Sequence, residues 1–424
     1  MVHVAIIRTN FIVYDTRLVK IIRSLNKRYS TVVLGWNREG RKLHNMEKMK
    51  KEIAGKSFEN PRVSLKIFNL KAPFGKPSLT LYFPMLIFFP VFWAWTLLNL
   101  ISIRPSVVHA CDLDAAVPCY IYKKIFGKKM VLDIFDRYAL TFIPRRFGIL
   151  FSLINSIEEF FAKESDVLIT VGEKVLETFK RKPKCFGIIS NFPDDYYKSK
   201  EEHSTKDVFT ILYSGPIMNG RSLEDISLLV KDLDNVEFWI HGQIVDKKLF
   251  GGITSLPAIK YKGHITNCDD YYKSIVQADA IIGIYTPETP SHNITMHNKT
   301  FEAMMCGVPM ITNLSPEFIS SIGSGIIVEY NNRDEIKAAI ITLRDKPELR
   351  RKLGNAGRKA FLEKYNWKNI EEDLYRLHDN LLMDADLSKK AQNESLIMNL
   401  PVLSFYYRIN RSLKSKVLSV KKLI

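Results

Sequence analysis

The chain has 424 residues, of which 46% are hydrophobic and 25% are charged, and its formal net charge is +17 at pH 7. This length favours two domains, and the composition is that of an ordinary globular protein. The positive charge favours an anionic partner, which includes nucleic acid, an acidic lipid surface or a phosphorylated ligand. The five cysteines lack C-x-x-C spacing, which argues against a disulfide framework or a zinc site and favours a reducing compartment.

The first half of the chain alternates short apolar runs with segments of helical spacing. It begins with MVHVAIIRTN, which predicts a strand rather than a signal peptide. The alternation is typical of a parallel sheet that is covered on both faces. No G-x-G-x-x-G follows the first strand, which argues against a dinucleotide-dependent enzyme. The predicted strands cover residues 2–8, 31–36, 63–69, 106–110, 129–133, 167–171 and 187–191, with helices over 15–25 and 157–163.

Residues 77–103 contain no charged residue over 27 positions and are rich in aromatic side chains. Their length would allow them to cross a bilayer. However, the strands before and after them belong to one predicted sheet, and Pro84 and Pro90 are expected to interrupt a helix. We therefore expect an interfacial helix or helical pair in the headgroup region, with a buried core helix or a membrane span as alternatives.

Polar side chains follow two central strands of this half, namely His109, Asp112, Asp133 and Asp136. Because the carboxyl ends of parallel strands meet at one edge of a sheet, these side chains are expected to share a ligand cleft. For each of them, capping or a satisfied hydrogen bond is the alternative to a catalytic role.

Residues 191–207 are polar and predict an inter-domain linker, after which the alternation of strands and helices resumes. Six short strands separated by helices predict a second, doubly wound domain. The strand tips carry glycine or polar residues that would let the backbone approach a nucleotide: Gly215, Arg221, His241, Gly242, Gly263 and His264. The predicted strands cover residues 209–213, 236–241, 259–263, 280–285, 308–313 and 325–328.

The stretch NKTFEAMMCGVPMITN, residues 298–313, predicts a short helix followed by a buried strand. Asn298 or Thr300 would cap the helix, and Gly307 would end it in a left-handed turn. The N-terminal end of such a helix binds phosphate through its backbone N–H groups and its dipole. Lys299 would add a charge, and Glu302, expected in the first turn, would accept hydrogen bonds from sugar hydroxyls. The alternative is a capped amphipathic helix whose first turn is polar.

Helical spacing resumes over residues 333–364 and 367–382, and the chain beyond Glu394 contains no acidic residue. Its basic amphipathic pattern over residues 391–424 favours contact with an anionic membrane surface. A solvated, disordered tail is the alternative. The basic residues of this tail are Arg408, Arg411, Lys414, Lys416, Lys421 and Lys422.

Three segments carry a resemblance to a known family: VVHACDLD (107–114), the run from GHI to GIY (263–285) and NKTFEAMMCGVPMI (298–311). Together they resemble family 4 glycosyltransferases of the GT-B fold, which are retaining and nucleotide-sugar-dependent, over most of residues 1–390. The resemblance implies an α/β protein with two Rossmann-like domains facing a cleft. The acceptor domain would cover residues 1–192, the donor-nucleotide domain 207–365 and a crossover helix 366–390.

The resemblance also implies roles for single residues. Glu302 would hold the donor ribose, and Arg221 and Lys299 would bind the diphosphate in place of a metal, so that no cofactor is expected. Donor binding is predicted for Arg221, Lys299, Glu302, Asn298, Thr300, His241, Gly242, His264 and Gly215, and catalysis for Asp136 and His109.

The chain departs from the family pattern at four places. The first glutamate of the family's Glu-x7-Glu motif is Ile294 here, and a frequent histidine after the fifth strand is Phe135. Pro216 replaces a basic residue, and the glycine-rich loop after the first strand is absent. We expect a divergent but active hexosyltransferase whose nucleotide-binding positions are intact.

The expected partners are a nucleotide sugar, a glycan or lipid-linked acceptor and an anionic membrane surface, without nucleic acid. The expected location is peripheral, on the cytoplasmic face of the membrane. One alternative is a GT-B-fold sugar-nucleotide epimerase, against which the apolar segment argues. The other is a non-enzymatic basic protein that binds membrane or nucleic acid, for which the charge alone argues.

Overall fold

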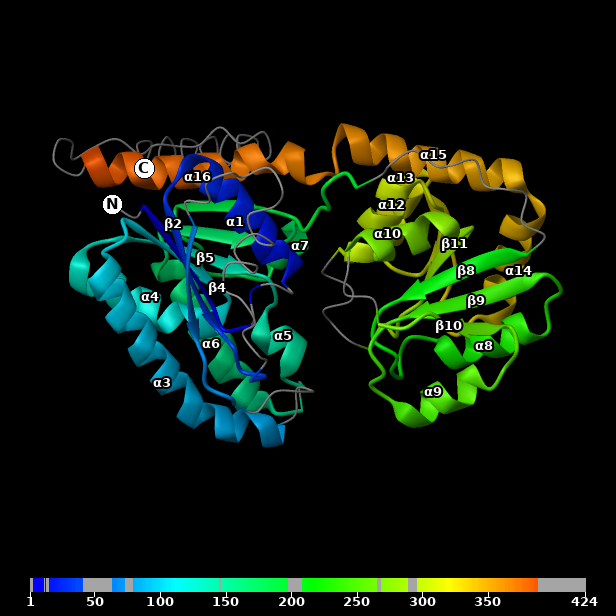
Figure 1. Ribbon diagram of the computed structural model, residues 1–424, viewed down its shortest axis with the longest axis horizontal. Coiled ribbons are helices and arrows are strands. Elements are labelled where there is room, and N and C mark those ends of the chain that lie inside the picture. Colours follow the sequence, from blue (N-terminus) through cyan, green and yellow to red (C-terminus); the bar gives the residue numbers. More distant parts are fainter. Residues whose placement is uncertain are drawn as a thin grey trace, which may run out of the picture.

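The computed structural model describes residues 3–10, 12, 15–40, 63–72, 79–144, 146–196, 208–264, 268–288 and 296–387. Figure 1 shows two domains side by side, each built from a sheet with helices on its two faces. All pairs of neighbouring strands in both sheets are parallel. The two Rossmann-like, doubly wound domains expected from the sequence are therefore present.

The N-terminal sheet has seven strands in the order β3-β2-β1-β4-β5-β6-β7. Its central strands are buried along their whole length, because helices cover both faces. The strand order reverses between β1 and β4, and open α/β sheets bind ligands at such a switch point. The strands are β1 (Val4–Arg8), β2 (Thr31–Trp36), β3 (Val63–Phe68), β4 (Val107–Cys111), β5 (Lys129–Ile134), β6 (Val167–Thr170) and β7 (Cys185–Ile188).

The apolar segment of the N-terminal domain is one continuous helix, α3 (Leu79–Ile103), which runs through both prolines. The expected interruption at Pro84 and Pro90 is therefore wrong. Each proline removes one helical hydrogen bond, but tertiary packing holds the helix: Phe92 is fully buried and stacks on Trp36 at 5.0 Å. Among the described residues, no helix combines the length and apolar character needed to cross a bilayer.

The other helices of this domain are α1 (Thr16–Arg28), α4 (Leu113–Phe126), α5 (Tyr138–Phe142), α6 (Gly148–Glu164) and α7 (Glu173–Glu177). Helix α1 begins at the N-cap Asp15, whose side chain accepts a hydrogen bond from the backbone N–H of Leu18. Helix α4 lies next to both α3 and α6. In chain order, α1 is the first helix after β1, and β1 borders the switch point of the sheet.

The C-terminal sheet has six strands in the order β10-β9-β8-β11-β12-β13, with its switch point between β8 and β11. The strands are β8 (Phe209–Ser214), β9 (Val236–His241), β10 (Ile259–Tyr261), β11 (Ala280–Gly283), β12 (Met310–Thr312) and β13 (Gly325–Ile327). The helices are α8 (Leu223–Lys231), α9 (Lys247–Thr254), α10 (Cys268–Gln277), α12 (Asn298–Cys306), α13 (Pro316–Ile322), α14 (Arg333–Asp345) and α15 (Pro347–Glu363).

The last described helix, α16 (Trp367–Leu387), lies against α1 and β7 of the N-terminal domain (Figure 1). Its side chains Leu374 and Leu377 are completely buried, and the Trp367 indole N–H donates a 2.9 Å hydrogen bond to Ser24 of α1. The start of the expected linker is also packed, since the ring of Phe192 meets that of Phe301 at 4.6 Å. Residues 197–207 and the basic tail lie outside the described residues.

Candidate active site

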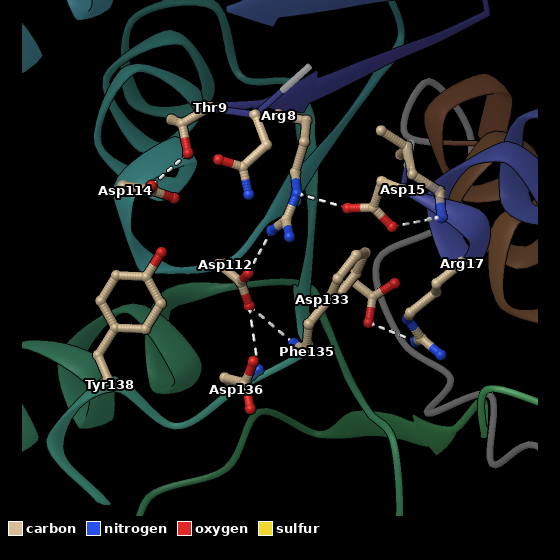
Figure 2. A network of polar contacts seen from close by, with 12 residues as sticks. Arg8, Thr9, Asp15, Arg17, Asp112, Asp114, Asp133, Phe135, Asp136 and Tyr138 are labelled. Carbon is tan, nitrogen blue, oxygen red and sulfur yellow. Dashed lines mark hydrogen bonds and ion pairs between the residues drawn. The ribbon is translucent and has the colours of Figure 1, made fainter. Parts of the chain in front are cut away.

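A polar network connects the carboxyl ends of β1, β4 and β5 at the N-terminal switch point (Figure 2). Arg8, at the end of β1, donates to Asp112, and its Nε lies 2.9 Å from a carboxylate oxygen of Asp15. Oδ1 of Asp112 accepts hydrogen bonds from the backbone N–H groups of Phe135, at 2.7 Å, and Asp136, at 3.3 Å. The loop after β5 is thereby fixed relative to β1 and β4.

Phe135 stands where the family resemblance would place a histidine, and its ring contacts two cations. The guanidinium carbon of Arg8 lies 4.3 Å from the ring centroid, and that of Arg17 lies 4.7 Å from it. Arg17 also forms an ion pair with Asp133 at 2.7 Å. The position of the histidine is thus occupied by an apolar platform that holds two arginines.

Two carboxyl groups of this network have raised pKa values. Burial raises the pKa of Asp112 to about 7, against the opposing effect of Arg8. Burial also raises the pKa of Asp136. Within the described residues, the Asp136 carboxylate has no hydrogen-bond partner, and it lines the cavity between the domains. The structure therefore places a carboxyl group with a raised pKa, that of Asp136, at the cavity.

His109, the second predicted catalytic residue, lies elsewhere. Its side chain is completely buried, with Nε2 3.4 Å from Asp133 and Nδ1 3.1 Å from Nε2 of His378 on α16. It does not line the cavity and is not brought to Asp136. A buried side chain at this position does not fit direct contact with an acceptor. Its ring instead contacts the Asp133 carboxylate.

The helix expected to receive phosphate, α12, begins at Asn298, so its N-cap lies one residue before Asn298. His297 is the N-cap and makes no side-chain cap hydrogen bond, so the expected capping by Asn298 or Thr300 is wrong. The Thr300 side chain is buried, and Glu302 is the fifth helical residue rather than part of the first turn. Gly307 ends the helix at φ 64°, which confirms the expected left-handed turn. Asn298 lines the cavity.

The two predicted diphosphate binders meet at one tyrosine. The guanidinium carbon of Arg221 lies 3.7 Å from the ring centroid of Tyr285. Nζ of Lys299 donates a hydrogen bond to the hydroxyl of the same tyrosine and lies 4.5 Å from its ring centroid. Tyr285 follows β11 at the C-terminal switch point. The structure thus gathers both cations where open α/β sheets bind ligands.

Glu302 is held by a short chain of hydroxyl groups. The Tyr271 hydroxyl donates a 2.7 Å hydrogen bond to Oε2 of Glu302 and accepts a 3.0 Å hydrogen bond from Ser214. Burial raises the pKa of Glu302, and the Tyr271 hydrogen bond opposes this shift. Oε1 of Glu302 has no hydrogen-bond partner among the described residues, so it is available to a ligand hydroxyl.

The strand tips of this domain approach one another very closely. A Cβ atom at Gly242, whose φ is 148°, would lie 1.7 Å from the carbonyl oxygen of Gly215, so only glycine fits there. Gly215 in turn lies beside the Lys299 ammonium group. His241 is buried, burial lowers its pKa, and neither of its ring nitrogens has a hydrogen-bond partner within the described ranges. His264 is exposed.

A cavity of about 500 Å³ lies between the domains, and its lining includes the start of α12 but not Arg221, Lys299 or Glu302. Arg8, Arg17 and Asp136 line its N-terminal wall, and Asn298 and Phe301 line its C-terminal wall. In the part of the chain that the structure describes, no three His, Cys, Asp or Glu side chains are placed to hold a metal ion. Ile294 lies outside the described residues.

Four contributors to the site were not predicted: Arg8, Arg17, Tyr271 and Tyr285. A charged residue directly at the end of an apolar strand is a visible signal for Arg8. Arg17 lies in a helix in which the apolar face is the most visible sequence pattern, and this pattern does not single out Arg17. Nothing in the local sequence marks Tyr271 or Tyr285 as a partner of the helix at residue 298.

Comparisons with known proteins agree with this architecture. Residues 221–376 match a family model described as glycosyl transferase-like. The solved structure of sucrose-phosphate synthase from Thermosynechococcus elongatus has a TM-score of 0.67 and 13% identity, covering 90% of this chain and 100% of that one. HepE from Anabaena, in complex with UDP, has the same four values. No curated protein sequence matches the chain.

A glycosyltransferase from Rickettsia africae has a TM-score of 0.61 and 11% identity, covering 90% of this chain and 98% of that one. At such low identities these likenesses establish the fold. They confirm the expected arrangement of two facing Rossmann-like domains, which is the GT-B fold.

Proposed function

We propose that this chain, a glycosyltransferase on the GT-B fold, moves a sugar from a nucleotide sugar to a glycan or lipid-linked acceptor at a membrane surface. The observation that carries the proposal is that Arg221 and Lys299 both contact Tyr285. Lys299 lies on α12, the helix that also carries Glu302. The HepE structure, which contains UDP, supports a nucleoside diphosphate as the leaving group.

The donor site provides positive charge where negative charge develops. As the glycosidic bond to the diphosphate breaks, the leaving oxygen becomes anionic, and fixed cations and dipoles stabilise it most where water is excluded. Lys299, Arg221 and the N-terminal end of α12 supply these groups. Glu302 would accept hydrogen bonds from the ribose through Oε1, while Tyr271 holds its other oxygen.

The opposite wall supplies negative charge. Glycosyl transfer passes through a cation-like sugar, and carboxylates facing the anomeric carbon favour this species. Asp136 would orient the acceptor hydroxyl. From the resemblance around Asn298 we also propose retention, in which the acceptor attacks from the face that the diphosphate leaves.

A membrane location is supported by the outer surface of the N-terminal domain. On α3, Ile87 is 73% exposed and Leu98 68%, and on the neighbouring helix α4, Ile125 is 63% exposed. Exposed apolar side chains gathered on adjacent helices are typical of an interaction surface. We propose peripheral binding to the cytoplasmic face of an anionic membrane, with the basic tail as a second contact.

The test is a thermal-shift panel of UDP-, GDP- and ADP-sugars with the full chain, wild type beside Glu302→Ala. Glu317→Ala, which removes an exposed carboxylate from α13, is the matched control. We expect one donor class to raise the melting temperature of wild type and control, and to leave Glu302→Ala unchanged. A panel without any shift, or equal shifts in all three proteins, would contradict the donor site.

Product analysis then separates the reactions. Incubation of the binding donor with acceptors, followed by NMR of the new glycosidic bond, is expected to show the anomeric configuration of the donor. Inverted configuration would overturn retention. Conversion of the donor to its epimer without an acceptor would identify an epimerase instead.

A further inference from the structure

The start of the connection between the domains, residues 191–196, is packed against both of them, and we call it the linker segment. The chain leaves the N-terminal domain after β7 and returns to it at α16. The two crossings touch, because the backbone N–H of Trp367 donates a 3.0 Å hydrogen bond to the carbonyl oxygen of Pro193. The linker segment is therefore held at the junction of the two domains.

On the N-terminal side, a buried lysine of α1 holds the linker segment. Nζ of Lys20 donates hydrogen bonds to the side-chain oxygen of Asn191, at 2.8 Å, and to the carbonyl oxygen of Phe192, at 2.5 Å. The same ammonium group lies 5.0 Å from the ring centroid of Trp367. Lys20 is only 7% exposed, and burial of a charge is costly unless such partners replace its water. Lys20 thus joins both crossings of the chain to α1.

On the C-terminal side, the linker segment contacts the two helices that carry the Glu302 hydrogen bond. The ring of Phe192 meets that of Phe301 on α12 edge to face, at 4.6 Å. The ring of Tyr196 stacks on that of Tyr272 on α10, at 4.9 Å. The segment therefore rests on α10 and α12 at the same time.

A third contact joins the linker segment to α12 through α15. The two terminal guanidinium nitrogens of Arg358 lie 2.8 and 2.9 Å from the two carboxylate oxygens of Asp195. Arg358 also donates a 2.9 Å hydrogen bond to the carbonyl oxygen of Met305 on α12. Both ends of the linker segment are thus fixed relative to α12.

These contacts lie directly beside the pair that orients the Glu302 carboxylate. Phe301 precedes Glu302 in α12, and Tyr272 follows Tyr271 in α10. Because consecutive residues of a helix move together, a displaced linker segment would also displace the hydrogen bond between Tyr271 and Glu302. The position of this carboxylate therefore depends on a segment that the N-terminal domain holds.

We propose that Lys20 is a positioning residue for the donor, because it holds the linker segment against α10 and α12 and thereby fixes Glu302 for the ribose. The inference rests on the proposed function, since that function assigns Glu302 to the donor. The donor site lies in the C-terminal domain, yet it depends on a side chain of the N-terminal domain.

The experiment measures the affinity of the full chain for UDP, GDP and ADP by calorimetry. Lys20→Met removes the ammonium group and keeps an unbranched side chain, and we expect it to weaken binding of the preferred nucleotide about tenfold. Lys27→Met removes the same charge from another lysine of α1, which is 48% exposed and pairs with Glu371. This control is expected to bind like the wild type.

The pH dependence of the affinity separates positioning of Glu302 from a merely structural role. Burial raises the pKa of Glu302, and the charge of Lys20 opposes this shift. Burial lowers the pKa of Lys20 itself to about 7, so its charge is present in acid, where it delays protonation of Glu302. The groups that face Glu302 are Tyr271, Lys299 and Lys20, and those that face Lys20 are Asp194, Arg17, Glu302 and Asp15.

Nucleotide affinity is expected to fall as the pH drops from 7 to 5 and Glu302 takes up a proton. In Lys20→Met this fall should begin at a higher pH than in the wild type. Lys20→Arg, which retains the charge, should keep the pH profile of the wild type. A loss of affinity by the same factor at every pH in Lys20→Met would overturn the inference.

A second variant tests the linker segment without a change of charge. Tyr196→Ala removes the stack on Tyr272, and we expect it to weaken nucleotide binding several-fold with the pH profile retained. This variant decides the question if Lys20→Met does not fold.

Amide hydrogen exchange over residues 298–306, without nucleotide, gives a readout that does not depend on the donor. Exchange there should be faster in both variants, Lys20→Met and Tyr196→Ala, than in the wild type. Unchanged exchange and unchanged affinity in both would overturn the inference alone. A wild type that binds none of the three nucleotides would contradict the proposed function instead.

Discussion

The hydroxyl group of Tyr271 lies 2.7 Å from Oε2 of Glu302, and it joins two elements that the chain order separates by 31 residues. Through this contact, α10 fixes the orientation of a carboxylate on α12. Ser214, at the end of β8, completes the chain at 3.0 Å. The position of Glu302 therefore depends on residues that need not touch the donor themselves.

Replacement Tyr271→Phe removes the donor to Glu302 and leaves the ring in place. A hydrogen bond to a charged group contributes about 1.5–3 kcal/mol, so we expect KM for the donor to rise about tenfold or more with a smaller change in kcat. Steady-state kinetics at varied donor concentration measure both constants. Tyr375→Phe is the control, because it removes a buried tyrosine hydroxyl that donates to Ser24 in the other domain. Equal effects of the two variants would mean that Tyr271 contributes only to folding.

Loss of either cation at Tyr285 is expected to slow the chemical step. Removal of one preformed group that stabilises developing charge typically costs about 100-fold or more in kcat. We expect this loss for Lys299→Ala, and a smaller loss for Arg221→Lys, which retains the charge but not the planar group. Lys231→Ala, at a lysine that is half-exposed on α8, controls for the change in net charge. Unchanged kcat in Lys299→Ala would remove this residue from the mechanism.

The contact between His378 and His109 is expected to make stability depend on pH. Burial and the neighbouring His109 lower the pKa of His378 to about 3, whereas an unfolded histidine has a pKa of about 6.5. Between these values the unfolded chain takes up a proton that the folded chain does not, so stability present above pH 6.5 is lost as the pH falls towards 3. We expect His378→Gln to flatten this loss, by about 3 kcal/mol at pH 4.5.

Urea unfolding of the two proteins between pH 7 and pH 4 measures this difference. His264→Gln serves as the control, because His264 is exposed on the C-terminal domain. It should retain the slope of the wild type. Parallel curves for wild type and His378→Gln would show that the buried histidine does not govern acid sensitivity.

The exposed apolar side chains of α3 are expected to contribute to membrane binding. Burial of one large aliphatic side chain contributes about 1.5–3 kcal/mol, so the double replacement of Ile87 and Leu98 by Glu should weaken binding to phosphatidylglycerol vesicles more than tenfold. Vesicle co-sedimentation of the full chain provides the measurement. Leu362→Glu, at a leucine of α15 that is 51% exposed, should bind like the wild type. Undiminished binding of the double variant would exclude α3 from the contact.

Much of the fold could be predicted because the strands are apolar runs bounded by polar residues. The bounds of β2 and β9 agree with the prediction to the residue. Helix α6 begins at Gly148, nine residues before the expected start. Its first turns carry apolar residues on the exposed side, at Ile149 and Leu153, so the contrast between an apolar and a polar face is lost there.

The site could be predicted only in part, for a different physical reason. Glycines at strand tips and a charged residue at a helix start are local signals, and they led to Gly215, Gly242 and Lys299. The pairs that organise the site, such as Arg17 with Asp133, join residues 116 positions apart, and no local pattern encodes such a pair. The same applies to His109, whose burial depends on α16 and could not be inferred from the strand that carries it.

The packing of α16 on the N-terminal domain has a consequence for biosynthesis. Leu377 fits so closely against β7 that a Cβ atom at Gly187 would lie 2.7 Å from it. Until residues 367–387 have left the ribosome, the surfaces of α1 and β7 that receive this helix stay in contact with water or with a chaperone. The first domain to be translated therefore matures last, and a nascent chain arrested before residue 367 should be more sensitive to protease in its earliest segment than the finished protein.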